Sequence, residues 1–110
     1  MSMTEEELYN MSTTLAKYIS LGLKEFNSYS VGIPGCLLSP SYSYMTDKKA
    51  KRRHHRAMEK KWHRILEDMI FAFDYAIEGA DSFTDHSTDE HKRYKKGMRL
   101  FSKHFLHLWF

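Results

Sequence analysis

The side chains in this sequence that are best suited to chemistry are the cations of one short stretch. Residues 48–64 contain nine lysines and arginines and one acid, a net charge of +8, whereas the rest of the chain sums to −5. Cations at this density can neutralise several phosphates of a nucleic acid. The residues that we expect to contact such a polyanion are Lys48, Lys49, Lys51, Arg52, Arg53, Arg56, Lys60 and Arg64. Tyr42, Tyr44 and Trp62 flank the stretch and could stack on exposed bases.

Two other interpretations of this charge stay open. The cations could form a solvated helical face that serves solubility, or a surface that meets an acidic protein, because electrostatic complementarity speeds encounter with either kind of partner. The sequence contains no zinc-finger, RNP or helix–turn–helix signature. We therefore predict a polyanion-binding surface that lacks a known motif.

Histidines are the next candidates, since three groups of them stand at spacings that could chelate a metal. These groups are His63 with Glu67, His104 with His107, and Asp85-His86 with His91. However, the HExxH pattern is absent, the chain has one cysteine, and no relation in sequence would assemble four ligands. We predict no metal site and no cofactor.

Catalysis has one candidate nucleophile. Cys36 follows Pro34-Gly35 in an irregular segment, and nearby cations could lower the pKa of its thiol. No GxSxG motif, P-loop or dinucleotide fingerprint accompanies it. We predict that the protein is not an enzyme and has no catalytic residues.

The composition limits the class of protein. A chain of 110 residues that is 42% hydrophobic and 15% aromatic can bury a core of its own. A single cysteine excludes a disulfide scaffold within the chain and favours a reducing compartment. No apolar run approaches the roughly 18 residues that a spanning helix needs, and the acidic start is unlike a signal peptide. We expect a cytoplasmic protein without a membrane segment.

Three amphipathic helices must position these residues. The predicted helices cover about 4–26, about 46–78 and about 88–109, with a Ser-, Gly-, Pro- and Tyr-rich loop at 27–45. Their expected N-terminal caps are Thr4 for the first, Thr46 or Asp47 for the second, and Ser87 or Thr88 for the third. The fold class that follows is all-α: a small three-helix antiparallel bundle, one domain over 1–110, with a long loop between the first two helices.

Apolar residues at spacings of three and four define the expected core faces. In the first helix this stripe is Leu8, Met11, Leu15, Tyr18, Ile19, Leu23 and Phe26. The largest core side chains are expected to be Trp62, Phe73, Phe101 and Phe105. The first three turns of the second helix are charged on all sides, so they project into solvent, fray or need a partner.

The apolar pattern of residues 58–110 carries a resemblance. It reads Trp62-x-x-Ile65-Leu66-x-x-Met69-Ile70-x-x-Phe73, then Gly97-x-x-Leu100-Phe101-x-x-x-Phe105-x-x-Leu108-Trp109. This spacing resembles a family of small uncharacterised proteins from tailed bacteriophages. The resemblance implies a phage accessory protein in the host cytoplasm but no activity, and it leaves residues 1–57 unexplained.

The expected function is therefore non-enzymatic binding of a macromolecule, with nucleic acid or another polyanion on the basic helix 48–64. The alternative is a protein-directed inhibitor or assembly factor that acts on a host protein through its acidic and aromatic surfaces. The expected partner is accordingly nucleic acid or an acidic host protein, with a homodimer as a further possibility. Leu106, Trp109 and Phe110 would mark a protein interface, such as that of a homodimer, if they are exposed.

Overall fold

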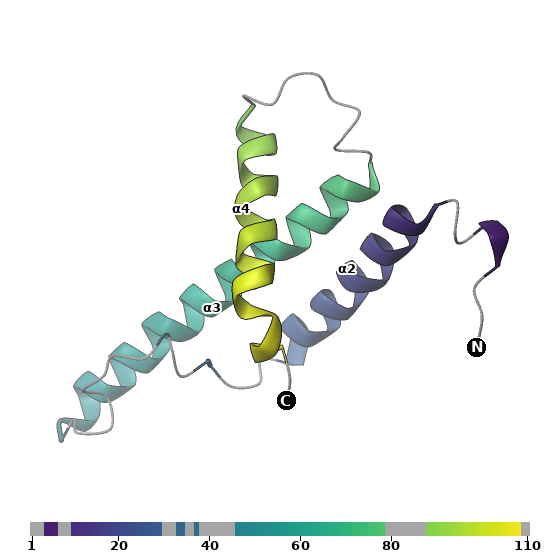
Figure 1. Cartoon of the computed structure of the whole chain (residues 1–110). Helices are drawn as coiled ribbons and strands as arrows, with labels where there is room; N and C mark the ends of the chain where they lie inside the picture. Colours follow the sequence, from purple (N-terminus) through teal and green to yellow (C-terminus); the bar gives the residue numbers. More distant parts are fainter. Residues whose placement is uncertain are drawn as a thin grey trace.

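The computed structural model of the chain describes residues 4–6, 10–29, 33–34, 37, 46–78 and 88–108. Its long helices are α2 (Met11–Tyr29), α3 (Lys48–Ile77) and α4 (Asp89–His104), followed by a 3-10 turn, η4 (Phe105–His107). No strand occurs among the described residues (Figure 1). The predicted all-α fold with three helices is confirmed.

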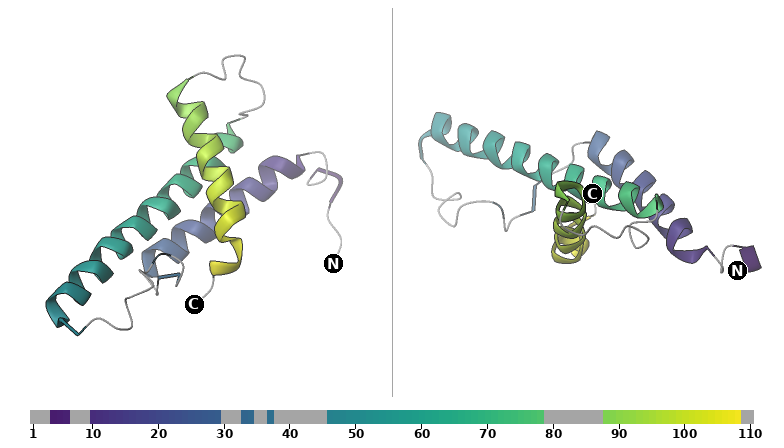
Figure 2. Two further views of the ribbon diagram at one scale, coloured as in Figure 1. Left: turned by 60° about the vertical axis from the view of Figure 1, so that its left-hand side comes forward. Right: turned by 90° about the horizontal axis from the view of Figure 1, so that it is seen from above.

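Helix α3 is the central element. Helices α2 and α4 both pack on it, α2 antiparallel to it and α4 crossing it obliquely (Figures 1 and 2). Its N-terminal half extends past both neighbours. The chain is accordingly elongated, with a Cα radius of gyration of 17.2 Å, compared with about 13 Å for a compact domain of this length.

Side-chain caps start α3 and α4 where the sequence predicts them. The Asp47 carboxylate accepts hydrogen bonds from the backbone N–H of Lys49 at 2.9 Å and of Ala50 at 3.4 Å. The Thr88 hydroxyl accepts one from the backbone N–H of His91 at 3.1 Å. Each bond satisfies a donor that would have no partner within the first helical turn.

The core lies along the C-terminal half of α3. Its buried side chains there recur at helical spacing and include Trp62, Ile65, Leu66, Met69 and Phe73. Helix α2 adds Ala16 and Leu23, and half-buried Phe101 of α4 packs on the same cluster. The expectation that Trp62 and Phe73 fill the core is therefore confirmed.

Truncation of the core should be costly at Met69, which is 0% exposed. We expect Met69→Ala to lower the free energy of unfolding by about 2–5 kcal/mol, because it removes buried methylenes and leaves a cavity. Urea denaturation followed by circular dichroism would measure this loss. Tyr18→Ala is the control, since Tyr18 is 80% exposed and its truncation should cost less than about 0.5 kcal/mol. Equal losses in the two variants would contradict this core.

The first helix differs in its bounds from the prediction. Residues 5–6 are helical, 7–9 lie outside the described residues, and α2 continues to Tyr29, three residues past the expected end. The expected loop 27–45 is therefore helical at its start. Within it, Ile33 and Leu37 are half-buried, and Leu37 packs on the core. The rest of that loop, with Cys36, lies outside the described residues.

Helix α2 buries only part of the face that was expected. Met11, Leu15 and Tyr18, predicted to point inward, are exposed. The buried residues of α2 are Ala16, Ser20 and Leu23. Ile19, Leu23 and Phe26 of the expected stripe do lie in or against the core. The buried face is therefore rotated from the predicted one, toward small and polar residues to which apolar spacing gave no weight.

Polar contacts to α3 explain this rotation. The Ser20 hydroxyl, 2% exposed, donates a hydrogen bond to Asp74 Oδ1 at 2.5 Å, and Lys24 Nζ lies 3.3 Å from Asp74 Oδ2. Further along, His63 Nδ1–H donates to Asn27 Oδ1 at 2.5 Å. Buried polar groups need partners, so these pairs select which side of α2 faces α3.

The C-terminal end of the last helix is shorter than expected. Helix α4 gives way to η4 at Phe105, whereas the pattern predicted helix to about residue 109. Phe105 is 58% exposed, so the expectation that it fills the core is wrong. Leu106 is 83% exposed, and Trp109 and Phe110 lie outside the described residues.

Candidate nucleic-acid interface

Seven of the eight predicted contact residues share one exposed side of α3. Five of them stand four residues apart and the other two lie beside that row, so they form a continuous face. We call this face the α3 cationic ridge: Lys48, Lys49, Arg52, Arg53, Arg56, Lys60 and Arg64. It follows about 24 Å of the helix at 1.5 Å per residue.

Lys51, the eighth predicted contact residue, is half-buried and lines a shallow depression together with Lys48, Arg52 and Arg56. One aromatic residue predicted to flank this surface lies elsewhere. Trp62 is 3% exposed and packs edge-on against the ring of His104, with centroids 5.4 Å apart. The expectation that Trp62 stacks on bases is therefore wrong. Tyr42 and Tyr44 lie outside the described residues.

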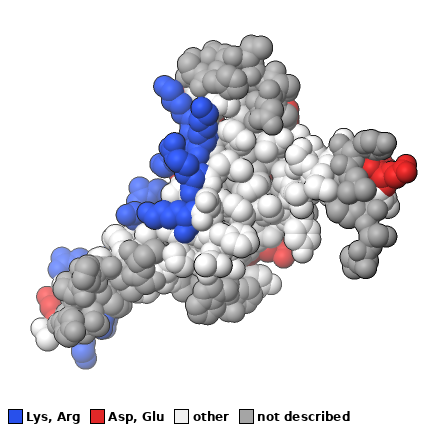
Figure 3. Space-filling model, viewed as in Figure 1, with Lys and Arg blue, Asp and Glu red and all other residues white. Residues whose placement is uncertain are grey.

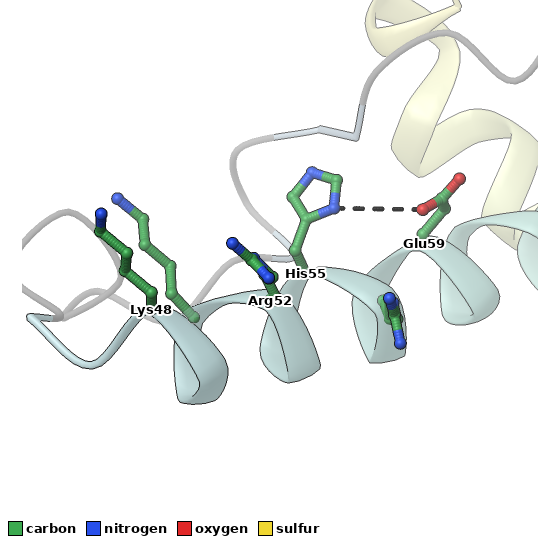
Figure 4. Close-up of a pocket in the computed structure, with 6 residues that line it drawn as sticks. Lys48, Arg52, His55 and Glu59 are labelled. Carbon is green, nitrogen blue, oxygen red and sulfur yellow. Dashed lines mark ion pairs between the residues drawn. The ribbon is translucent and has the colours of Figure 1, made fainter.

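The ridge retains its charge. Among the described residues, none of its seven cations forms an ion pair with a carboxylate. Glu59, the acid of this segment, instead lies 4.0 Å from Nδ1 of His55, as Figure 4 shows. Lys48 and Arg52 are drawn in the same view along the helix, at a shallow depression that His55 and Glu59 also line. These cations are available to an external anion.

A second group of cations lies on α4. Five exposed residues recur along one side of that helix, and we call them the α4 cationic stripe: Lys92, Lys95, Lys96, Arg99 and Lys103. In Figure 3, Lys and Arg atoms form a column along the edge of α4 and continue to its crossing with α3. Residues 92–103 hold six cations and no acid, so this second basic run can be recognised in the sequence. A comparison of the net charge of 48–64 with the sum over all other residues does not reveal it, because acids elsewhere cancel this run.

Arg93, the sixth cation of that run, makes contacts within the protein. Its Nε donates to Asp68 Oδ1 at 3.0 Å, and its guanidinium carbon lies 4.3 Å from the centroid of the Phe71 ring. Asp68 Oδ2 also lies 3.5 Å from Lys96 Nζ. The acid at the crossing is thus compensated by two cations of α4.

The ridge and the stripe meet at a crevice where α4 crosses α3. It encloses about 410 Å³, and we call it the α3–α4 crevice. Its polar lining residues are Lys61, Arg64, Asp68, Lys96, Lys103 and His104, and its apolar ones are Leu37, Ile65 and Leu100. Cations from two helices therefore surround one apolar hollow.

Close packing of the two helices creates this junction. Gly97 of α4 lies directly on α3, where an added Cβ would be 2.6 Å from Ala72 Cβ and nearer still to the carbonyl oxygen of Asp68. Only a residue without a side chain fits at this distance. The crossing point is therefore fixed by Gly97.

No family model, curated protein or solved structure that was compared with the chain matches it. None of the described helices combines the length and the apolarity that a membrane-spanning segment requires.

One of the residues that line the crevice, His104, pairs with a second histidine, His107. His104 is 1% exposed, and its Nδ1 lies 3.0 Å from Nδ1 of His107, so one ring donates this hydrogen bond and the other accepts it. In the described part of the chain, no three His, Cys, Asp or Glu residues are grouped to hold a metal. Asp85 and His86, the other expected partners of His91, lie outside the described residues.

Burial holds the pKa of His104 below its usual value, and the charges of His107, Lys103 and Lys61 lower it further. A depressed pKa means that the folded protein binds fewer protons at His104 than the unfolded chain does. This contribution to stability is complete above about pH 6.5 and is lost as the pH falls through the lower, folded-state pKa.

We therefore expect the free energy of unfolding to fall as the pH is lowered below about 6.5. His104→Gln, which cannot titrate, should reduce the slope of this dependence. Urea denaturation at several pH values would measure both proteins. His55→Gln is the control, because His55 is exposed and does not line the crevice. A slope that is the same in His104→Gln as in the parent protein would contradict this assignment.

Proposed function

We propose that the protein binds nucleic acid along the α3 cationic ridge and the α4 cationic stripe. The observation that carries this proposal is the exposed ridge, whose cations have no carboxylate partner among the described residues. Lysine and arginine side chains in such rows release counterions when they neutralise phosphates, which drives association without a sequence code. The role is binding only, with no catalysed reaction.

The setting of this function is a further part of the proposal. The resemblance to tailed-phage proteins supports a phage accessory protein in the bacterial cytoplasm. Its motif residues on α3, such as Trp62, Leu66 and Met69, are core residues here, so the resemblance bears on the fold and not on the ridge.

Salt dependence tests the proposed binding. Fluorescence anisotropy with labelled 30-mer duplex and single-stranded DNA would give the dissociation constant between 50 and 300 mM salt. We expect log K to fall linearly with log salt, with a slope of the order of −5 if most of the ridge contacts phosphates. A flat dependence, or no retention of the protein on heparin, would reject nucleic-acid binding.

A second candidate function is the binding of a host protein. The exposed side of α2 favours it, because Leu15, Tyr18 and Tyr29 are 48%, 80% and 66% exposed. Exposed apolar side chains in a row are typical of a protein interface. Capture from nuclease-treated bacterial lysate, compared between the parent protein and Tyr18→Glu, would test this function. A captured protein that Tyr18→Glu loses favours the second candidate, and identical captures reject this surface.

A further inference from the structure

The α3–α4 crevice differs from the ridge in the direction of its cations. Along the ridge, side chains diverge from one convex helix, which suits a long polyanion that lies across it. At the crevice, Lys61 and Arg64 approach from α3 while Lys96 and Lys103 approach from α4. Cations that converge from two elements on one hollow favour a compact anion.

The charges of the crevice are only partly compensated within the described residues. Asp68 is engaged by Arg93 and Lys96. Lys61, Arg64 and Lys103 have no carboxylate partner there. Lys61 and Lys103 line the same hollow as His104, and their charges help to lower the pKa of its ring. Three cations around one hollow repel one another, and a bound anion would relieve this repulsion.

The apolar lining narrows the class of anion. Ile65, Leu100 and Leu37 line the same hollow, and Ile65 is 7% exposed. An inorganic anion would leave this surface unused. The volume of about 410 Å³ falls within the range of about 300–1,000 Å³ that is typical of small-molecule sites. A ligand with one apolar part and one anionic part matches both halves of the lining.

We infer that the α3–α4 crevice binds one nucleotide, with its phosphate at Lys61, Arg64 and Lys103 and its base against Ile65 and Leu100. The inference deepens the proposed function and rests on it, because the ridge and the stripe would lead a bound strand to this point. A free mononucleotide and the terminal nucleotide of a strand share this chemistry, so the experiment must separate them.

Calorimetry and NMR on the full chain test the site with adenosine 5′-monophosphate, adenosine and inorganic phosphate as probes. The nucleotide should bind at least about 10-fold more tightly than either of its parts, because it alone satisfies both the cations and the apolar lining. Its dianion should also raise the pKa of His104, which an NMR titration of the ring would report. Inorganic phosphate that binds as tightly as the nucleotide would overturn the inference, as would a nucleotide that leaves the resonances of His104 unchanged.

A matched pair of variants locates the site. Lys103→Gln should weaken nucleotide binding about 5- to 10-fold. Lys17→Gln should leave it unchanged, because Lys17 is an exposed residue of α2 that does not line the crevice. If both variants weaken it equally, the crevice is not the site. Melting curves of both variants would confirm that each remains folded.

Competition separates the two sources of the nucleotide. If the end of a strand occupies the crevice, a 5′-phosphate on a single-stranded 12-mer should raise its affinity, and adenosine 5′-monophosphate should compete with it. If the ligand is a free nucleotide, neither effect occurs although the nucleotide still binds. Nucleotide binding without any strand binding would keep the crevice site and reject the proposed function. Binding of a strand, together with no effect of the nucleotide on His104, would keep the proposed function and reject the crevice site.

Discussion

Gly97→Ala should destabilise the protein by about 1–3 kcal/mol or more, even though alanine is the better helix former. Intrinsic propensity alone predicts a gain of about 1 kcal/mol for this change in a helix interior. The added methyl group, however, would lie 2.6 Å from Ala72 Cβ and closer to the backbone of α3, which cannot yield as a flexible side chain would. Separation of α4 from α3 would in turn open the core at Phe101.

Gly22→Ala is the matched control for this prediction. Gly22 lies in α2, and nothing lies within 4 Å of where its Cβ would be. The same substitution should therefore stabilise the protein there, by roughly 0.5–1 kcal/mol. Thermal melting of the two variants should show shifts of opposite sign. Two shifts of the same sign would mean that α4 does not cross α3 at Gly97.

Neutralising the ridge should have the largest effect on binding. In the variant Arg52→Gln, Arg53→Gln, Arg56→Gln, Lys60→Gln, four ridge cations are lost but good helix formers remain. We expect affinity for DNA at 100 mM salt to fall by at least about 100-fold. The slope of log K against log salt should become shallower by about 3 to 4, since each lost phosphate contact accounts for about 0.9.

Two measurements keep this result interpretable. The variant should remain folded and melt within about 8 °C of the parent protein, because four exposed substitutions of less than about 0.5 kcal/mol each sum to less than about 2 kcal/mol. A second variant, with Arg52, Arg53 and Arg56 changed to lysine, retains the charge and should retain most of the affinity. Unchanged affinity in the glutamine variant would reject the ridge, and a large loss in the lysine variant would point to bidentate contacts by arginine.

Local signals in the sequence predicted the local features of the fold well. The caps at Asp47 and Thr88 depend on hydrogen bonds within one helical turn, so sequence spacing contains them. The core face of α3 also follows from its period, because apolar residues dominate that face. The orientation of α2 does not follow from the period of its apolar residues. It depends on the pairing of Ser20 with Asp74, which lie 54 residues apart in the sequence.

The parts of the candidate site that lie within one helix could be predicted from the sequence, and the part that lies between two helices could not. The exposure of the ridge follows from a helix whose N-terminal half lacks an apolar stripe. The burial of Trp62 follows from its register with Ile65, Leu66 and Met69, and it could have been derived from the core pattern. The α3–α4 crevice could not be predicted in this way. Lys61 and Lys103 line one hollow because α4 crosses α3 at Gly97, and this crossing point is a tertiary contact that sequence spacing does not contain.

Helix α3 is 30 residues long without a break, and its two halves are subject to different constraints on sequence. From Trp62 onward, each inward position is limited by neighbours in van der Waals contact. Before it, exposed positions such as Arg52 and Arg56 need only a residue that tolerates a helix. Substitutions in separate regions that share no partners tend to have additive effects. Ligand preference can therefore evolve at one end of this rod while the other end keeps the chain folded.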